Sequence, residues 1–307
     1  MVPRTLQPCI AIVGSTGVGK TALALAVAQA ADAEIVNLDS RQVYRGLDIG
    51  SAKPTAAERA LAPHHLFDVV APDEPFDCAR YRELACRVVT EIQSRGRPVV
   101  LVGGTGLYLR VLRNGLFAGP ARNPALRAQL ETTESTDPGH LYRCVQRVDP
   151  ETANRVHPHD RVRLIRALEV YQLSGRPISE WQREHGFRDT GLRMCTIGID
   201  LDRATLYARL NARCESMVAA GLIDEVRELW ARGYGPELGP LRSIGYREIG
   251  AYLHGQCDLA TAIVDMAGAT RHLAKRQLTW FRADPDVRWY DAASVEVSRL
   301  LAAWHGE

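Results

Sequence analysis

The sequence contains no apolar run that approaches the roughly 18 residues needed to cross a membrane, and it contains no cysteine pair in C-x-x-C spacing. Its N-terminus, Met1-Val-Pro-Arg-Thr-Leu-Gln-Pro8, lacks the apolar segment of a signal peptide. The seven cysteines are scattered along the chain, and this distribution favours reduced thiols over a disulfide framework. We therefore expect a cytoplasmic protein that does not associate with membranes.

The chain also lacks a marked excess of charge of either sign, since its formal net charge is only +2. A nearly neutral chain neither requires nor excludes a nucleic-acid partner, so any basic surface has to be local. The histidines at positions 64, 65, 157 and 159 match no zinc-binding spacing. The N-K-x-D motif of a nucleotide switch is missing as well.

One segment has the composition of a phosphate-binding loop. Residues 10–21 are IAIVGSTGVGKT, an apolar strand followed by G-x-x-x-x-G-K-T, and a helical pattern comes next. Such a loop turns backbone N–H groups inward and adds the positive end of the following helix, so it binds phosphate. Lys20 can reach the outer phosphate, and the Thr21 hydroxyl can hold Mg²⁺. The predicted diphosphate cradle consists of Gly14, Ser15, Thr16, Gly17, Val18, Gly19, Lys20 and Thr21.

The acid that usually accompanies this loop at the end of a later buried strand is missing. In NTPases that acid organises Mg²⁺ and water for hydrolysis, but here the strand at 98–102 runs into Gly103-Gly-Thr-Gly106. An acid occurs earlier, at Asp39, where a parallel sheet would place its ligands. Asp39 can act as a Mg²⁺ ligand, a general base or a helix cap, and Thr105 either contacts a ligand or belongs to a plain turn. This arrangement indicates a transferase that holds a diphosphate rather than a motor or a switch.

Short apolar strands alternate with helical segments in the first part of the chain, as in the βαβ units of a parallel sheet. This pattern predicts an α/β protein with a P-loop NTPase-like parallel sheet core. The predicted strands are 9–13, 34–38 and 98–102, and the predicted helices are 20–31, about 78–95 and 106–113.

The pattern changes at a Gly/Pro/Asn cluster over 114–124, after which the chain is almost wholly helical as far as 187. A strand returns at 194–200, and helices dominate from there to 282. We expect an inserted all-helical domain at 115–193 in a core formed by 1–114 and 194–307. The tail at 290–307 is predicted as one short helix.

A basic segment near the C-terminus, TRHLAKRQLTWFR at 270–282, contains no acid. At helical spacing Arg271, Lys275, Leu278 and Arg282 share one face, with aromatic residues adjoining. Positive charge beside aromatic rings suits a nucleic-acid backbone and an unstacked base, whereas a solvated helix face would normally include acids. RVRLIR at 161–166 and RSIGYR at 242–247 are weaker examples of the same kind.

These segments, in this order, resemble the tRNA dimethylallyltransferases (tRNA isopentenyltransferases), and the resemblance extends from about residue 10 to 282. The family's loop usually reads G-P-T-A-x-G-K-T, so Ser15 and Gly17 are departures that remove no catalytic group. The matching segments are GSTGVGKT (14–21), DSRQVYRGLDIGSAKP (39–54), HHLFD (64–68), GGTGLYLR (103–110), RVHPHDRVRLIRALEVY (155–171), RSIGYRE (242–248) and TRHLAKRQLTWFR (270–282).

The resemblance implies transfer of a dimethylallyl group from dimethylallyl diphosphate to N6 of the adenosine just 3′ of the anticodon, position 37, in tRNAs that read codons starting with U. It implies Mg²⁺ as cofactor and an anticodon stem–loop held partly by the helical insertion. Nothing in the sequence argues against a monomer, and we expect one. The catalytic residues implied are Asp39 as base, Thr105 near the reacting base, and Lys20 and Arg213 on the diphosphate. The tRNA-binding residues implied are Asp39, Ser40, Arg41, Gln42, Thr105, Arg127, Arg163, Leu164, Ile165, Arg166, Arg242, Ser243, Ile244, Gly245, Tyr246, Arg247, Lys275, Arg276, Gln277, Thr279, Trp280 and Arg282.

Three alternatives remain open at this point. A small-molecule P-loop kinase would turn over ATP and use the insertion as a lid. A prenyltransferase of free adenine nucleotides would need neither the basic segment nor so long an insertion. An NTP-dependent RNA-binding switch would hydrolyse nucleotide and would need switch motifs that are not visible.

Overall fold

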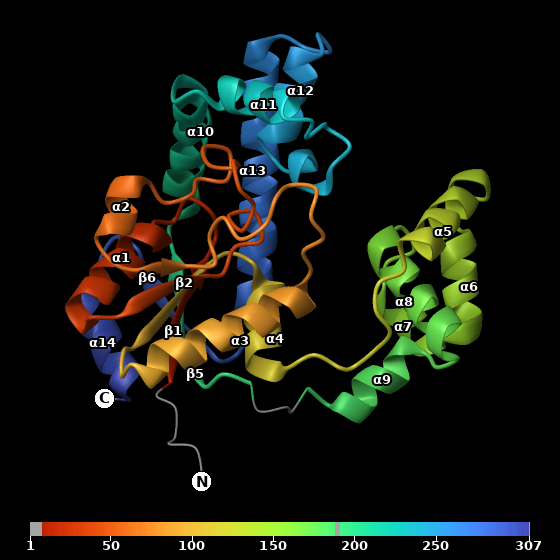
Figure 1. Cartoon of the computed structure of the whole chain (residues 1–307), viewed down its shortest axis with the longest axis horizontal. Coiled ribbons are helices and arrows are strands. Elements are labelled where there is room, and N and C mark those ends of the chain that lie inside the picture. Colours follow the sequence, from red (N-terminus) through yellow and green to blue (C-terminus); the bar gives the residue numbers. More distant parts are fainter. Residues whose placement is uncertain (1–7, 188–190, 307) are drawn as a thin grey trace. The chain divides into compact units, whose positions relative to one another are not determined.

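The chain divides into two compact units in the computed structural model, which describes residues 8–187 and 191–306 (Figure 1). One unit comprises residues 1–113 and 192–307, and the other comprises residues 114–191. The second unit thus begins one residue before the expected 115–193 range and ends two residues before its end.

The first unit is built on one six-stranded sheet in the order β3-β2-β4-β1-β5-β6. All neighbouring strands are parallel, so their carboxyl ends meet at one edge, where ligands of such sheets bind. The predicted α/β class with a parallel core is confirmed. The strands are β1 (Cys9–Gly14), β2 (Glu34–Asn37), β3 (His64–His65), β4 (Val99–Gly103), β5 (Met194–Asp200) and β6 (Val287–Asp291).

The two outer strands, β3 and β6, were not expected from the sequence. The prediction of one helix over 290–307 is wrong in its first part, because β6 extends to Asp291 and the helix α14 spans only Val297–His305. Strand β6 exists because it pairs with β5, with Trp289 opposite Gly198. This pairing is a long-range contact that the local pattern of the tail does not reveal.

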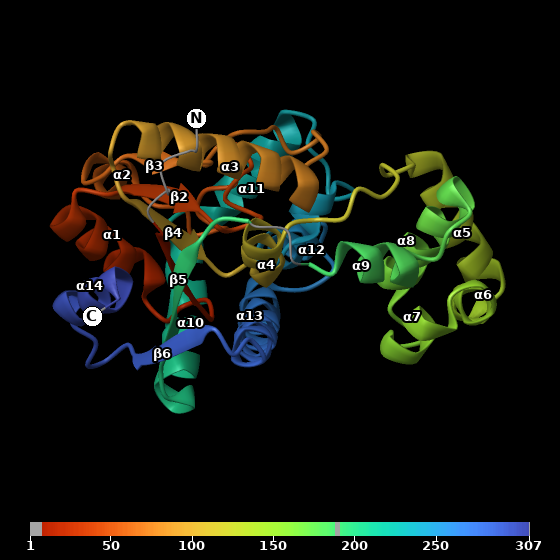
Figure 2. The same cartoon turned by 90° about the horizontal axis from the view of Figure 1, so that it is seen from below.

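Helices cover both faces of the sheet. Strand residues such as Ile10, Ile12 and Val100 form an apolar cluster with α1 (Lys20–Ala31) and α14. Helix α3 (Cys78–Ser94) contacts β2 and β4, and Figure 2 shows it on the opposite face from α1 and α14. Within the described residues, no helix is both long and apolar enough to cross a bilayer.

A second apolar cluster joins the C-terminal helices to the loop that follows β2, through side chains such as Leu47, Val226, Ile249 and Met266. This packing fixes the loop residues beside the carboxyl edge of the sheet. The remaining helices of the unit are α2 (Ala56–Ala60), α4 (Gly106–Asn114), α10 (Arg203–Ala219), α11 (Leu222–Ala231), the 3₁₀ helix η1 (Gly239–Arg242), α12 (Tyr246–Leu253) and α13 (Leu259–Arg282).

The second unit is wholly helical in its described part and has its own core, with Leu141, Val145, Leu164 and Leu168 at its centre. Side-chain caps define several helix starts, as at Asn123 and Asp149. At the root of the insertion, the Leu192 N–H donates to the Leu112 carbonyl at 2.8 Å. The helices are α5 (Pro124–Thr136), α6 (His140–Val148), α7 (Pro150–Arg155), α8 (Arg161–Ser174) and α9 (Ile178–His185).

Candidate active site

The phosphate loop connects β1 to α1 and lines a cavity of about 350 Å³, the phosphate-loop cavity. Thr16, Gly17, Gly19, Lys20 and Thr21 contribute to its wall. The Lys20 ammonium folds back over the loop and donates to the Ser15 carbonyl at 2.7 Å. The cradle therefore combines a helix N-terminus with an ammonium group, which suits a phosphate ligand.

Lys20 lies in an environment that opposes its charge. Burial lowers the pKa of its ammonium group to about 8, Asp39 opposes this change, and Arg213 adds to it. Arg213 responds to the same surroundings, since burial lowers its pKa while Cys214 and Asp39 raise it. Lys20 and Arg213 are thus two cations that line this cavity together with the Asp39 carboxylate, and an anionic ligand would stabilise both of them.

Asp39 follows β2 and is positioned by the backbone of its neighbours. Asn37 Oδ1 accepts the Asp39 N–H at 2.9 Å, and Asp39 Oδ1 accepts the Arg41 N–H at 2.8 Å. The carboxyl end of β4 lies directly against the backbone of Leu38, because a Cβ on Gly103 would lie 2.2 Å from the Leu38 carbonyl oxygen. Glycine at 103 therefore allows the two strand ends to meet, with the second Asp39 carboxylate oxygen left for a ligand.

Thr105 forms hydrogen bonds with the residues on either side of Asp39. Its hydroxyl oxygen accepts the Ser40 N–H at 3.0 Å, and its own N–H donates to the Leu38 carbonyl at 3.2 Å. These bonds tie the Gly103–Gly106 turn to the residues beside Asp39. The hydroxyl proton remains available to donate to a bound group.

The loop over 42–54 is held by polar contacts within the loop and to Asp68. Lys53 donates to Asp48 at 2.5 Å, to Asp68 at 2.6 Å and to the Tyr44 carbonyl at 2.7 Å. The Gln42 side chain donates to the carbonyls of Ser51 and Ala52 at 3.1 and 3.0 Å. Much of this motif therefore shapes the cavity wall rather than contacting a ligand.

A second cavity, of about 340 Å³, adjoins the first. We call it the arginine cavity, because Arg41, Arg213, Arg242, Arg247 and Arg276 line it. It shares part of its wall with the phosphate-loop cavity. The shared residues are Thr16, Asp39, Ser51, Arg213 and Gln277.

Gln277, on α13, joins the two loops at this shared wall. Its Oε1 accepts the Thr16 N–H at 2.8 Å, and its Nε2 donates to the Gly104 carbonyl at 2.9 Å. One side chain thus sets the spacing between the phosphate loop and the Gly103–Gly106 turn. Sequence reasoning assigned Gln277 to RNA, but its amide is engaged at both ends by the protein backbone.

Sequence reasoning missed one arginine at the phosphate loop. Arg209 lines the phosphate-loop cavity together with Arg213, one helical turn away on α10. The i, i+4 spacing of the two arginines in the sequence was the signal that could have identified the pair. Neither forms an ion pair with a carboxylate among the residues that the structure describes.

Most side chains of the basic segment on α13 either line one of two cavities or pack against α4. Arg276 and Gln277 line the arginine cavity, whereas Lys275, Thr279 and Arg282 line a different cavity. Trp280 is 38% exposed and lies against α4, since a Cβ on Gly106 would meet its Nε1 at 2.1 Å. Three residues of the predicted shared face, Lys275, Leu278 and Arg282, thus line one cavity together with Thr279, whereas the other residues assigned to RNA on this helix lie elsewhere.

The 242–247 turn contributes unequally to the arginine cavity. Arg242 and Arg247 are exposed, and Arg247 Nε donates to Glu248 at 2.9 Å. Ser243 and Ile244 are half-buried in the cavity wall. Tyr246, beside the buried Gly245, is only 2% exposed and donates its hydroxyl to Glu225 at 2.6 Å, so its ring supports the turn from within.

In the helical insertion, two of the predicted tRNA-binding arginines bind an internal acid. Arg127 donates to Glu169 at 2.8 and 2.9 Å, and Arg166 donates to it at 2.7 Å. Burial would raise the pKa of Glu169, but hydrogen bonds from Arg127, the Asn123 N–H and Arg166 lower it to about 2. These arginines therefore stabilise the insertion itself.

The neighbouring residues of α8 also differ from the prediction. Leu164 and Ile165 are 0% and 3% exposed, so the expected contacts with tRNA cannot come from their side chains. They belong to the apolar core of the insertion. Arg163 is exposed and lies 3.1 Å from Asp160, and it remains accessible to a polyanion.

A Mg²⁺ ion fits the donor groups at the phosphate-loop cavity. The Thr21 hydroxyl and the Asp39 carboxylate line the same cavity, and Mg²⁺ commonly takes one or two protein oxygens and completes its shell with phosphate oxygens and water. Among the described residues no cluster of three or more His, Cys, Asp or Glu could hold a metal. His64 instead lies 2.7 Å from the Ala62 carbonyl, and His65 lies 2.6 Å from Glu34.

The sequence matches the family model for IPP transferase over residues 42–284. The tRNA dimethylallyltransferases of Syntrophobacter fumaroxidans and Geobacter sulfurreducens are 49% and 47% identical to it, each covering 97% of this chain, with 88% and 96% of their own lengths covered. The crystal structure of a tRNA isopentenylpyrophosphate transferase from Bacillus halodurans is similar, with a TM-score of 0.70 at 37% identity over 98% of this chain and 95% of that one. A eukaryotic dimethylallyltransferase acting on tRNA gives a TM-score of 0.79 at 30% identity, covering 96% of this chain and 78% of its own. This chain belongs to the IPP transferase family.

Proposed function

We propose that this chain transfers the dimethylallyl group of dimethylallyl diphosphate to N6 of the adenosine just 3′ of the anticodon, in tRNAs that read codons starting with U. The observation that best supports this assignment is the shared wall of the two cavities, where Asp39 and Arg213 face both. A diphosphate ester on the phosphate loop and a base entering through the arginine cavity would meet beside Asp39. The relatives are named as tRNA dimethylallyltransferases, which disfavours the kinase, free-nucleotide and switch alternatives.

On the donor side, the phosphate loop, Lys20, Arg209 and Arg213 would hold the diphosphate. The bond between the allylic carbon and its oxygen breaks, and negative charge grows on the departing diphosphate. Preorganised N–H groups and cations that face this charge lower the barrier. Mg²⁺, held by the Thr21 hydroxyl, would supply further neutralisation of the leaving group when bound.

On the acceptor side, the adenine amine is a weak nucleophile because its lone pair is conjugated with the ring. As the bond from N6 to the allylic carbon forms, N6 has to lose a proton, and Asp39 is placed to accept it. Thr105 holds the Asp39 loop through Ser40 and can donate its own hydroxyl proton to the base or backbone. Turning the base out of its stack costs a few kcal/mol, which exposed arginines at the arginine cavity would offset by binding phosphates.

Affinity for dimethylallyl diphosphate should fall as the pH rises above about 8, because the pKa of Lys20 is lowered to about 8. The sign follows from the charge, since only the protonated amine attracts the diphosphate, so the Kd should rise about tenfold per pH unit above that pKa. Calorimetric titration with an unreactive thiolodiphosphate analogue between pH 6.5 and 9.5 measures this. Lys20→Met should bind weakly at every pH and lose the dependence, and a flat wild-type profile would contradict the role of Lys20.

Gln277→Glu should weaken the binding of both substrates, dimethylallyl diphosphate and tRNA. The carboxylate keeps an acceptor for the Thr16 N–H but places a second acceptor against the Gly104 carbonyl, so the loops separate. Each lost hydrogen bond of this kind is worth about 1 kcal/mol, and we expect KM to rise roughly fivefold for each substrate. Exposed Gln256→Glu is the matched control, and an increase confined to tRNA would indicate that Gln277 is a direct RNA contact.

The proposed function is tested by incubating the protein with tRNA, Mg²⁺ and either dimethylallyl diphosphate or ATP, and then analysing nucleosides by mass spectrometry. We expect an adenosine heavier by one isopentenyl unit, formed only with the prenyl donor. Unmodified tRNA accompanied by steady ATP consumption would overturn the proposal and favour a kinase or a switch.

We also infer that the protein acts as a cytoplasmic monomer. The support for a monomer is that one unit of a single chain supplies the residues that line both cavities. Light scattering during gel filtration, with activity measured across the peak, checks this inference. Activity confined to a dimer fraction would contradict it.

A further inference from the structure

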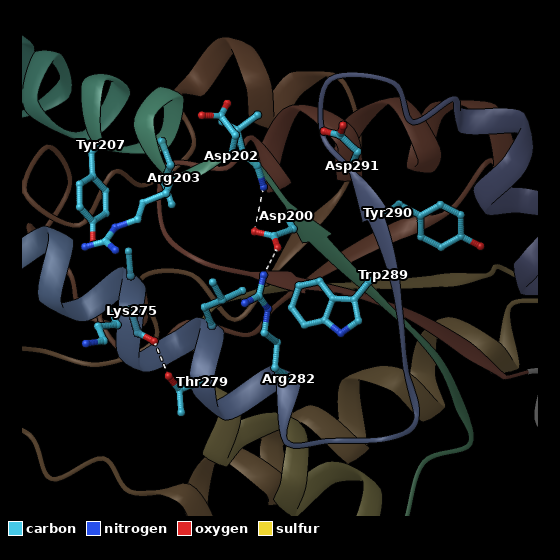
Figure 3. Close-up of a pocket in the computed structure, with 14 residues that line it drawn as sticks. Asp200, Asp202, Arg203, Tyr207, Lys275, Thr279, Arg282, Trp289, Tyr290 and Asp291 are labelled. Atoms are coloured by element: carbon cyan, nitrogen blue, oxygen red, sulfur yellow. Dashed lines mark hydrogen bonds and ion pairs between the residues drawn. The ribbon is translucent and has the colours of Figure 1, made fainter.

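A third cavity, of about 650 Å³, shares no lining residue with the other two. We call it the Trp289 cavity. It lies between α10, α13 and the carboxyl ends of β5 and β6, and Figure 3 shows the side chains that surround it. The transfer of the dimethylallyl group described above does not use it.

One wall of this cavity is an indole ring laid on the sheet. Trp289 is paired with Gly198 across β5 and β6, and a Cβ on Gly198 would lie 2.8 Å from the Trp289 atoms Cδ2 and Cε3. The ring therefore covers the bare backbone of the glycine, an arrangement that stabilises a sheet edge. Because Trp289 is only half-buried and lines the cavity, its ring also offers apolar surface to a ligand.

A second aromatic ring lies on α10. The Arg203 guanidinium carbon is 5.1 Å from the centroid of the Tyr207 ring, and both residues line the cavity, as Figure 3 shows. Tyr290, by contrast, packs against the apolar cluster of α1 and α14. The aromatic surface of the cavity is therefore provided mainly by Trp289 and Tyr207.

The carboxylates of the cavity are already engaged. Asp200 accepts from Arg282 at 2.6 Å and from the Leu201 N–H at 2.9 Å. Asp202 accepts the Thr205 N–H at 3.0 Å, and Asp291 accepts the Ala293 N–H at 2.9 Å. These acids serve as helix cap, turn and ion-pair partners.

Two cations of the cavity, Lys275 and Arg203, differ from these acids in their contacts. Within the part of the chain that the structure describes, neither Lys275 nor Arg203 forms an ion pair with a carboxylate. Both are exposed residues at the cavity. A ligand that carries both an aromatic ring and a negative charge could stack on Trp289 or Tyr207 and form an ion pair with Lys275 or Arg203.

The surface of α13 connects this cavity to the arginine cavity. Arg276 lines the arginine cavity and Thr279 lines the Trp289 cavity. The two residues are three positions apart, so they share one face of α13, and both are exposed. No acid occurs in α13 after Asp265. A nucleic-acid strand that enters the arginine cavity can therefore follow an acid-free surface into the Trp289 cavity.

We propose that the Trp289 cavity binds a second, unmodified nucleotide of the RNA substrate, with its base stacked on Trp289 and its phosphate held by Lys275 and Arg203. This inference rests on the proposed function, since it places that nucleotide on the same loop as the acceptor adenosine. It assigns to the cavity a role in RNA selection rather than in the chemistry.

The first test uses an anticodon stem–loop RNA with 2-aminopurine placed in turn at each unpaired loop position. With the wild-type protein one position besides the acceptor should show fluorescence quenched by stacking. Trp289→Phe should retain that quenching, and Trp289→Leu should lose it. Trp230→Leu, which alters a half-buried tryptophan in another cluster, should leave it unchanged.

Steady-state kinetics provide the second readout. Trp289→Leu should raise KM for RNA roughly tenfold, as expected for loss of one base–aromatic stack, with kcat and KM for dimethylallyl diphosphate unchanged. Lys275→Gln, at an exposed position, should reduce the slope of log affinity for RNA against log salt by about one even if Trp289→Leu proves poorly folded. Unchanged RNA binding in both variants would overturn the proposal and leave Trp289 as a cover for Gly198.

A final comparison separates RNA from free nucleotides. AMP and UMP, titrated against the intrinsic fluorescence of the wild type and of Trp289→Phe, should bind only at millimolar concentration. Micromolar binding that does not compete with RNA would overturn the RNA assignment. Quenching at Trp289 without any prenylated adenosine would reject the proposed function while supporting the nucleotide site.

Discussion

Asp39→Asn should lower kcat for prenyl transfer by about two to four orders of magnitude, the usual contribution of a positioned general base. The asparagine side chain keeps an oxygen that can accept the Arg41 N–H, now at 2.8 Å from Asp39, so the loop should retain its shape. The amide oxygen cannot take up the N6 proton at neutral pH, and the amine therefore remains a poor nucleophile. Single-turnover formation of isopentenyladenosine measures the loss.

Two further measurements make this prediction specific. The Kd for tRNA should stay within about twofold of the wild type, because a base contributes mainly to the transition state. Asp73→Asn, at an exposed position in the loop before α3, is the matched control and should leave turnover unchanged. Wild-type turnover in Asp39→Asn would remove Asp39 from the reaction and direct attention to a substrate phosphate as proton acceptor.

Glu169→Gln should destabilise the helical insertion by about 3 kcal/mol, near the lower end of the cost of breaking a buried ion pair. Glu169 is 0% exposed, whereas its partners Arg127 and Arg166 are 18% and 31% exposed and can regain some water. Hydrogen exchange of amides in α5 and α8 should accelerate about a hundredfold, while amides of the parallel sheet should be unaffected. Glu180→Gln, an exposed acid in the same insertion, should change little.

The pH dependence of the insertion gives a second test of Glu169. Its pKa is lowered to about 2 from its ordinary value of 4.5, so the stabilisation is present above the unfolded value and is lost as the pH falls toward 2. The difference in exchange rate between wild type and Glu169→Gln should therefore shrink below pH 4.5. A constant difference down to pH 2 would mean that the carboxylate charge is not what holds Arg127 and Arg166.

The sequence predicted the parts of the site that depend on local chemistry. The loop from Gly14 to Thr21 has its chemistry in consecutive residues, and Asp39 directly follows a strand, so both could be recognised without a fold. Arg209 was missed although its spacing from Arg213 places both on one helix face. Strand β6 was missed because Trp289 is in a strand only through its pairing with Gly198.

Residue roles within motifs were harder to predict, because a motif does not separate side chains that contact a ligand from those that support them. Leu164 and Ile165 lie inside the core of the insertion, and Tyr246 is hydrogen-bonded to Glu225 beneath its turn. Gln277 bonds to Thr16 and Gly104, more than 170 residues away in the chain. Only the three-dimensional neighbours of such side chains reveal what they do.

The hydrogen bond between the Leu192 N–H and the Leu112 carbonyl has a consequence for how this protein can be divided. It places the departure and return points of the helical insertion on adjacent backbone groups, so a short turn could close the gap without displacing β5 or α4. The insertion could therefore be deleted, or replaced by the insertion of a relative, without interrupting the sheet of the other unit. Such an exchange would leave both cavities at the sheet edge intact, because residues of the other unit alone line them.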